Sequence, residues 1–187
     1  MKPTFRDQLD TTHALITALH LQSATVETIA DVIASAVLDG HTLFTCGNGG
    51  SAADAGHFAE ELSGRYRTNR RALPAQSLSI DALAITCIAN DFGYDAVFAR
   101  QIEALGRAGD VLCVFSTSGN SPSILAALAA ASAKKMITVA LLGKGGGKAR
   151  GMAQHEIIIP SDDSGRIQEM HMQIVHFVCE VIEQRCL

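Results

Sequence analysis

The sequence has no tryptophan and few other aromatic residues, with seven phenylalanines and two tyrosines among 187 residues. No run of lysine or arginine exceeds two residues, and the formal net charge is −4. A nucleic-acid-binding surface, which needs clustered positive charge, is therefore not indicated. No apolar run approaches the roughly 20 residues that span a bilayer, and the opening MKPTFRDQLD contains no apolar signal segment.

The cysteines also form no pattern. There are five, an odd number, and they contain no CxxC pair. They are Cys46, Cys87, Cys113, Cys179 and Cys186, and most of them lie in apolar runs. This arrangement favours reduced core cysteines in a cytoplasmic protein over a disulfide framework.

The length and apolar content suit one domain over residues 1–187. Hydrophobic residues make up 48% of the chain, which is enough for a full core. Apolar residues recur at helical spacing through 5–39 and predict two helices, 5–21 and 23–39, within an N-terminal extension over 1–40. Gly40 is predicted to end the second helix, as a glycine just after the last helical residue commonly does.

From residue 41 onward, short apolar runs alternate with helical stretches. The runs cover 42–46, 75–80, 111–115, 137–142 and 156–159. They lack clean alternation, as expected for parallel strands buried on both faces. Helical stretches are predicted at 51–64, 81–90, 95–106 and 121–134, with a long final helix at 164–186. This order predicts an α/β fold with a doubly wound, mainly parallel five-stranded sheet, whose ligands sit at the carboxyl ends of the strands.

The richest stretch for chemistry is CGNGGSAADAGHFAEE at 46–61. A glycine-rich turn follows the first predicted strand, and the helix after it carries His57 and Glu61. Residues four apart on a helix share one face. A small-molecule cradle and two groups able to bind a proton or a metal are therefore combined in one strand-turn-helix unit.

Two nucleotide motifs are only superficially matched. Gly47, Gly49 and Ala52 fit the dinucleotide pattern, but that pattern needs an acidic residue about 20 positions on, whereas the next predicted strand ends near Asp81, roughly 30 positions on. The segment GKGGGK resembles a phosphate-binding loop, yet Leu142 stands at its first glycine and Ala149 at its Ser/Thr. We interpret this segment, within 143–151, as a flexible loop.

A second polar cluster, STSGNSP at 116–122, follows the third predicted strand. Ser121 and Pro122 form a strong helix start, with serine at the N-cap and proline at the first helical position. Hydroxyls and free backbone N–H groups at a helix N-terminus make an anion site that suits a sugar monophosphate. The alternative is an ordinary serine-rich turn. Asn90 and Asp91 form another polar break, which by itself is ordinary turn chemistry.

The final helix carries Gln168, His171 and His176 among apolar residues. We expect His171 to be a core histidine, and His176 to be buried with a partner such as Glu61 or a metal. Gln168 and His176 are eight residues apart, about 12 Å along a helix axis. They would converge on one point only through long reaches, or if one of them came from another subunit.

Together these segments resemble the SIS (sugar isomerase) domain and, within it, the bacterial phosphoheptose isomerases. The matching text is CGNGGSAADAGHFAEEL, GRYR, ANDFGY, GDVLCVFSTSGNS and RIQEMH…H. The resemblance covers nearly the whole chain and implies a flavodoxin-like fold. It further implies conversion of D-sedoheptulose 7-phosphate to D-glycero-D-manno-heptose 7-phosphate in lipopolysaccharide core biosynthesis, a homotetramer with active sites at subunit interfaces, and one Zn²⁺ per site without a nucleotide cofactor.

The resemblance also implies roles for particular residues. Glu61 and His176 would transfer protons. The zinc ligands would be His57, Glu61, Gln168 and His176. Substrate contacts would come from Asn48, Gly49, Gly50, Ser51, Glu61, Asn90, Asp91, Ser116, Thr117, Ser118, Ser121 and Gln168, with Arg65 as a weaker candidate.

The residue chemistry agrees with an aldose–ketose isomerase, because enediol proton transfer needs one base, one acid and charge stabilisation on oxygen. A close SIS relative offers a non-enzyme alternative, a tetramer that binds the replication initiator DnaA, and ARQIEALGRAGDV and RIQEMHM resemble it. That relative departs at the Glu61 and His176 positions, whereas both residues are present here. One departure from some isomerases is Gly165, where they have aspartate before the arginine.

Overall fold

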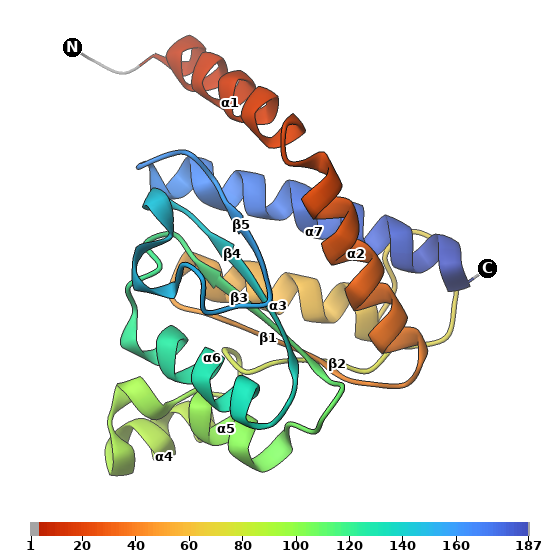
Figure 1. Cartoon of the computed structure of the whole chain (residues 1–187), viewed down its shortest axis with the longest axis vertical. Coiled ribbons are helices and arrows are strands. Elements are labelled where there is room, and N and C mark those ends of the chain that lie inside the picture. Colours follow the sequence, from red (N-terminus) through yellow and green to blue (C-terminus); the bar gives the residue numbers. More distant parts are fainter. Residues whose placement is uncertain (1–3, 187) are drawn as a thin grey trace.

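A five-stranded parallel sheet forms the middle layer of the protein, whose computed structural model describes residues 4–186 (Figure 1). The strands are β1 (Leu43–Gly47), β2 (Ala75–Ser77), β3 (Val111–Ser116), β4 (Ile137–Leu142) and β5 (His155–Ile158). Their order across the sheet is β2-β1-β3-β4-β5, and every neighbouring pair is parallel. The predicted doubly wound sheet is therefore confirmed, in the flavodoxin-like order.

Helices cover both faces of this sheet (Figure 1). On one face lie α2 (Ser23–Leu38), α3 (Gly50–Ser63) and α7 (Ser164–Cys186), with α1 (Phe5–His20) extending beyond them. On the other lie α4 (Ala82–Phe92), α5 (Ala99–Leu105) and α6 (Pro122–Ala133). Short 3₁₀ segments, η1 (Tyr94–Ala96) and η2 (Lys144–Ala149), complete the chain.

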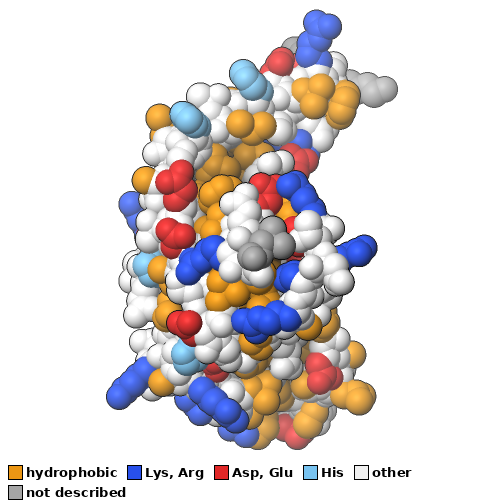
Figure 2. Space-filling model, turned by 90° about the vertical axis from the view of Figure 1, so that its right-hand side faces the viewer, with side chains coloured by type: hydrophobic (Ala, Val, Ile, Leu, Met, Phe, Trp, Pro, Cys, Tyr) orange, Lys and Arg blue, Asp and Glu red, His pale blue; other side chains and the backbone are white. Residues whose placement is uncertain are grey.

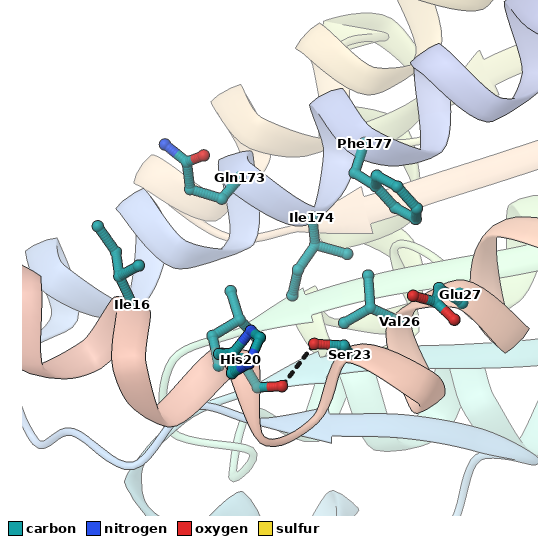
Figure 3. Close-up of a pocket in the computed structure, with 9 residues that line it drawn as sticks. Ile16, His20, Ser23, Val26, Glu27, Gln173, Ile174 and Phe177 are labelled. Carbon is teal, nitrogen blue, oxygen red and sulfur yellow. Dashed lines mark hydrogen bonds between the residues drawn. The ribbon is translucent and has the colours of Figure 1, made fainter.

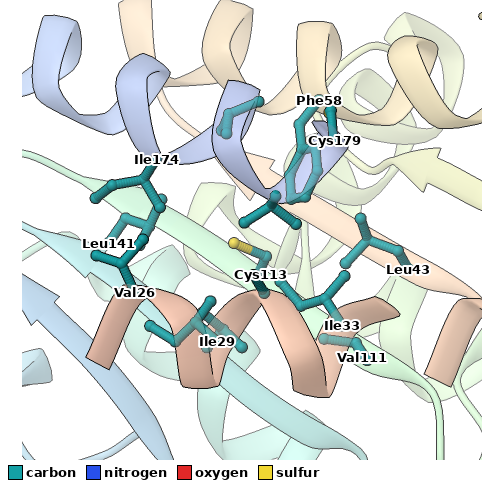
Figure 4. Packing of buried hydrophobic residues seen from close by; sticks show 14 of the residues in the cluster. Val26, Ile29, Ile33, Leu43, Phe58, Val111, Cys113, Leu141, Ile174 and Cys179 are labelled. Carbon is teal, nitrogen blue, oxygen red and sulfur yellow. The ribbon is translucent and has the colours of Figure 1, made fainter. Parts of the chain in front are cut away.

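Two apolar layers sandwich the sheet because successive strand residues point to opposite faces. In β3, Cys113 joins the layer under α2, α3 and α7, whereas Val114 joins the layer under α5 and α6. Figure 4 shows the first layer, where Ile33 of α2 and Phe58 of α3 approach the sheet together with Ile174 of α7. All six residues of β3 are buried, which explains its continuous apolar run.

Local signals explain several helix ends. Thr4 and Asp7 form a reciprocal capping box at the start of α1. Gly40 follows α2 with φ = +93°, as predicted for the glycine after a helix end. Ser121 is the N-cap of α6 with proline after it, but within residues 4–186 its side chain makes no capping hydrogen bond. The predicted N-cap position is right, whereas the expected capping bond is absent.

Two predicted elements differ from the structure. Strand β2 ends at Ser77 instead of residue 80, and the Ser79 hydroxyl beyond it donates to the Gly47 carbonyl at 2.8 Å. The helix expected over 95–106 is divided into η1 and α5, and the intervening Val97 and Phe98 are buried in the second apolar layer.

The surface view in Figure 2 shows acidic and basic side chains interspersed on one face, with apolar surface between them. Within residues 4–186, no single helix is long and apolar enough to cross a membrane. The bent pair of α1 and α2, with 72° between the helices, reaches the length and hydropathy of a span only when the two are taken together.

His171 is a core histidine, as predicted, with none of its surface exposed. Its Nε2 lies 3.3 Å from the Leu142 carbonyl oxygen, and its ring meets Phe115 edge-on. Burial lowers the pKa of His171 from 6.5 to about 4, although the hydrogen bond to Leu142 opposes this shift. The neutral ring therefore stabilises the fold above about pH 6.5, and this contribution is lost as the pH falls towards 4.

We predict that His171→Leu weakens the acid sensitivity of the fold. Between pH 7 and pH 5, His171 should remove about 2 kcal/mol from the free energy of unfolding of the unmodified protein, and the variant should lack this loss. Urea denaturation at both pH values measures it. His13→Gln, at an exposed position on α1, is the matched control. An equal pH dependence in protein and variant would contradict the prediction.

Candidate active site

The candidate site begins where β1 and β3 end side by side. Gly47 is opposite Phe115 in the parallel register, so the loops that follow the two strands meet at the same edge of the sheet. Between these loops lies a pocket of about 160 Å³. It is lined by Asn48, Ser51, Phe115, Ser116, Thr117, Ser118 and Ser121.

The first loop requires glycine at two positions. A side chain at Gly47 would overlap the Ser51 carbonyl, because the first turn of α3 folds back onto the end of β1. Gly49, the residue before α3, has φ = +58° and ψ = −124°, a conformation that residues with side chains rarely adopt. The glycines thus bring the N-terminus of α3 against the strand and place Ser51 in the pocket.

The serine loop after β3 is supported by the glycine-rich segment η2. The Gly119 N–H donates to the Ser116 Oγ at 3.0 Å, and a side chain at Gly119 would overlap the Gly146 carbonyl. Asn120 joins the two segments, because its Oδ1 accepts from the Lys148 N–H at 3.1 Å and its Nδ2 donates to the Ser118 carbonyl at 3.0 Å. The segment that resembles a nucleotide loop therefore supports the serine loop.

Asn48 is fixed at both ends of its amide. Its Oδ1 accepts from the Tyr94 hydroxyl at 2.7 Å, and its Nδ2 donates to the Ser123 Oγ at 3.0 Å. Tyr94 comes from η1 and Ser123 from the first turn of α6. The amide is thereby held between two elements that come together only in the folded sheet.

His57 and Glu61 form a pair on one face of α3. The Nε2 of His57 lies 3.0 Å from the Oε1 of Glu61, and the side chains are 40% and 14% exposed. Arg70 secures this end of the helix by donating to the carbonyl oxygens of Glu61 at 2.6 Å and Leu62 at 2.8 Å. A guanidinium at a helix C-terminus satisfies carbonyls that have no partner within the helix.

His176 on α7 completes a cluster with this pair. The His57 and His176 ring centroids are 5.5 Å apart, and one ligand atom from each of His57, Glu61 and His176 lies within 4.8 Å of the others. Glu61 and His176 therefore meet within one chain. His176 is also partly exposed, not buried as predicted.

Gln168 contacts the opposite end of α3. Its Nε2 lies 3.5 Å from the Ser51 Oγ, and a side chain at Gly50 would overlap its amide. The structure thus gathers three of the four predicted metal ligands into one cluster, and it places the fourth beside Ser51 at the pocket. Gln168 and His176 both contact α3, although they are eight residues apart on α7. This explains how both reach the region of the candidate site.

The remaining predicted substrate contacts lie on exposed surface. Asn90 and Asp91 are exposed near the end of α4, where the Nδ2 of Asn90 donates to the Oδ1 of Asp91 at 2.7 Å. Arg65 is exposed just after α3. The contacts that Asn90, Asp91 and Arg65 were expected to make with a substrate stay predictions.

Sequence reasoning missed several residues that surround the cluster. Tyr66 stacks against His176, with ring centroids 6.0 Å apart and 27° between the planes. Burial raises the pKa of Tyr66, with Arg67 opposing the rise and Glu180 adding to it, so the hydroxyl stays a donor. The only sequence signal for Tyr66 was its place in GRYR.

Asp54 also lies near the cluster. It has a buried oxygen without a hydrogen-bond partner among the described residues, and burial raises its pKa to about 6 while His57 opposes the shift.

A separate apolar groove of about 310 Å³ lies between α1, α2 and α7. Figure 3 shows Ile174 and Phe177 of α7 on one side, facing Val26 of α2 and His20 at the end of α1. The groove has none of the predicted catalytic or metal-binding residues in its lining. We therefore assign the chemistry to the pocket at the strand ends and the adjacent cluster.

Comparison with known proteins identifies the family. The SIS domain family model matches residues 8–143. Phosphoheptose isomerase 1 of Campylobacter jejuni is 44% identical over 170 residues, which cover 91% of each chain. The phosphoheptose isomerase of Vibrio cholerae is 51% identical over 86% of this chain and 84% of its own.

The chain belongs to the phosphoheptose isomerase family of SIS domain proteins. Solved structures agree. The phosphoheptose isomerase of Neisseria gonorrhoeae superposes with a TM-score of 0.85 at 36% identity, covering 97% of this chain and 100% of that one. The phosphoheptose isomerase of Francisella tularensis gives 0.87 at 34% identity over the same shares. These comparisons favour the isomerase over the initiator-binding alternative.

We predict that Gly50→Ala displaces Gln168 without destabilising the fold. The added methyl group would overlap a flexible side-chain amide, and alanine is favoured over glycine in helices by about 0.5–1 kcal/mol. A crystal structure of the variant should show the Gln168 amide moved away from Ser51, with an unchanged or raised melting temperature. Gly56→Ala, whose methyl group would meet only Ile80 at 3.4 Å, is the control. An unmoved Gln168 would refute the proposed contact.

Proposed function

We propose that this protein converts D-sedoheptulose 7-phosphate to D-glycero-D-manno-heptose 7-phosphate, the first step towards the heptose of the lipopolysaccharide core. The observation that carries the proposal is the meeting of Glu61 and His176, from α3 and α7 of one chain, beside a serine-lined pocket. Family membership supplies the substrate class, and the residue chemistry supplies the reaction type.

The pocket suits the phosphate end of such a substrate. Besides Ser51, four hydroxyl-bearing residues from the loop after β3 line it, and it lies at the N-terminus of α6, where free N–H groups favour an anion. They are Ser116, Thr117, Ser118 and Ser121. Because the Ser121 hydroxyl is not used as a helix cap within the described chain, it can donate to a phosphate oxygen.

Glu61 and His176 suit the proton transfer. In an aldose–ketose isomerisation, a base removes the proton from the carbon beside the carbonyl, and an acid protonates the adjacent carbon or oxygen of the enediol. A carboxylate oxygen of Glu61 and a ring nitrogen of His176 supply the two groups, and His57 orients Glu61 through its 3.0 Å contact. The partial burial of the cluster limits access of water to the intermediate.

The cluster also fits a zinc ion. Zinc–nitrogen and zinc–oxygen bonds of about 2.0–2.2 Å place two ligand atoms no more than about 4.4 Å apart. The three observed atoms lie within 4.8 Å of one another, so a small inward movement of the side chains brings them into that range. We propose that His57, Glu61 and His176 hold zinc, with Gln168 as the fourth ligand. Bound zinc would supply Lewis-acid stabilisation of oxygen charge.

We further propose a cytoplasmic homotetramer with sites completed by neighbouring subunits. The five free thiols suit a reducing compartment. Helix α4 is apolar yet has no buried residue, and Leu83 on it is 82% exposed, which favours a covering partner beside Asn90 and Asp91. The apolar face of α7 is mostly used within the chain, since Met170 and Val178 are buried in its own core.

We predict that Glu61→Gln removes activity while the fold persists. Loss of a general acid or base costs about 10²–10⁴-fold in rate. The assay incubates purified protein with D-sedoheptulose 7-phosphate and follows the heptose aldose by NMR. Glu60→Gln, at the exposed neighbouring position on α3, is the matched control and should retain kcat. A Glu61→Gln variant with near-normal kcat would exclude Glu61 from proton transfer, and an inactive unmodified protein would reject the proposed substrate.

We predict that Ser121→Ala raises KM for the phosphosugar more than it lowers kcat, because phosphate contacts bind ground and transition states alike. Since Ser121 makes no capping hydrogen bond among residues 4–186, the melting temperature should change little. Ser132→Ala, exposed near the other end of α6, serves as the control in steady-state kinetics and thermal unfolding. Equal turnover of a dephosphorylated heptulose would contradict the phosphate assignment.

A further inference from the structure

The loop after α3 is attached to α7 by carboxylates beyond His176 in the sequence. Glu183 is 6% exposed, and its Oε1 accepts from the Arg67 N–H at 3.1 Å and the Thr68 N–H at 2.9 Å. Glu180 accepts from the Tyr66 hydroxyl at 3.4 Å and pairs with the Arg67 guanidinium at 2.6 Å. Both the backbone and the side chains of this loop are therefore positioned by α7.

These contacts place Tyr66 against the ring of His176. The two rings are stacked with centroids 6.0 Å apart, within the range typical of offset aromatic pairs. The Arg67 guanidinium carbon lies 4.9 Å from the centroid of the Tyr66 ring, which restrains that ring in turn. Tyr66 also packs against the apolar layer beneath α7 and is partly buried.

We propose that Tyr66 is a positioning residue that sets the orientation of the His176 imidazole. This inference deepens the proposed function and rests on the role of His176 in that function. His176 is partly exposed, so the packing around it restrains its ring less than full burial would. Among the described residues, His57 meets its ring edge-on and Tyr66 stacks on it.

The stack matters because a proton-transferring ring nitrogen must point at its target. A histidine ring turns about two side-chain torsions, and catalytic groups have to be held within about 10–20° of the productive geometry. The flat face of Tyr66 opposes rotation of the imidazole plane, whereas the Tyr66 hydroxyl acts one step further away through Glu180. The aromatic ring should therefore count for more than the hydroxyl.

The test compares Tyr66→Phe with Tyr66→Leu in the full chain. Tyr66→Phe keeps the stack and should retain kcat within about threefold. Tyr66→Leu removes the aromatic plane and should lower kcat roughly ten- to a hundredfold, the range seen when a supporting partner of a functional residue is lost. KM should change much less, because Tyr66 is not among the residues that line the serine pocket. Phe5→Leu, which removes an exposed ring on α1, is the control.

Crystal structures of the same variants give a readout that does not depend on activity. The His176 ring should keep its orientation in Tyr66→Phe and turn in Tyr66→Leu. If Tyr66→Leu does not fold, Tyr66→Met makes the same comparison. An unmoved His176 ring and unchanged kcat in Tyr66→Leu would overturn the inference, as would an equal loss in Tyr66→Phe. An unmodified protein that is inactive on sedoheptulose 7-phosphate would reject the proposed function, and the ring orientation would still decide this inference.

Discussion

The packing of α7 along α3 is the contact on which the candidate active site depends. At one end Gln168 lies over Gly50 and Ser51, and at the other His176 lies beside His57. The two contact points are eight residues apart on α7, about 12 Å along its axis, and six or seven residues apart on α3, about 9–10.5 Å along its axis. An axial shift of either helix would break both contacts together. The absence of a side chain at Gly50 is what allows this close approach.

The fold could be predicted well from the sequence because parallel strands buried on both faces leave continuous apolar runs, and β4 was predicted over its observed residues 137–142. The errors occur where tertiary contacts replace local preference. Beyond β2, the Ser79 hydroxyl bonds the backbone of Gly47 at both its N–H and its carbonyl, so the polypeptide leaves the sheet early. Before α5, a segment whose composition alone favours a continuous helix is divided at Val97 and Phe98, both of which are buried.

The sequence indicated many residues of the candidate site, but it did not indicate which residues of different helices contact one another. Sequence spacing correctly indicated that His57 and Glu61 share a face, because that relation is local to one helix. Sequence spacing left open whether Gln168 and His176 reach one point through long side chains or from different chains. In the fold they contact α3 about two turns apart, at Ser51 and beside His57. Tyr66 was missed for the same reason, since its stacking partner is more than a hundred positions away and no periodicity relates the two.

Burial of carboxylates explains why the loop after α3 has a fixed place. A buried carboxylate costs free energy unless it accepts hydrogen bonds, and a turn leaves backbone N–H groups that need acceptors. Glu183 meets both requirements. Burial alone would raise its pKa, but the hydrogen bonds from Thr68 and Arg67 outweigh burial and lower the pKa below 4.5. Glu183 therefore stays ionised as the pH falls through the range where the unfolded side chain takes up a proton, and over that range it keeps the loop on α7. The helix that carries His176 thus also positions the loop that carries Tyr66, which places the two stacked rings on one rigid support.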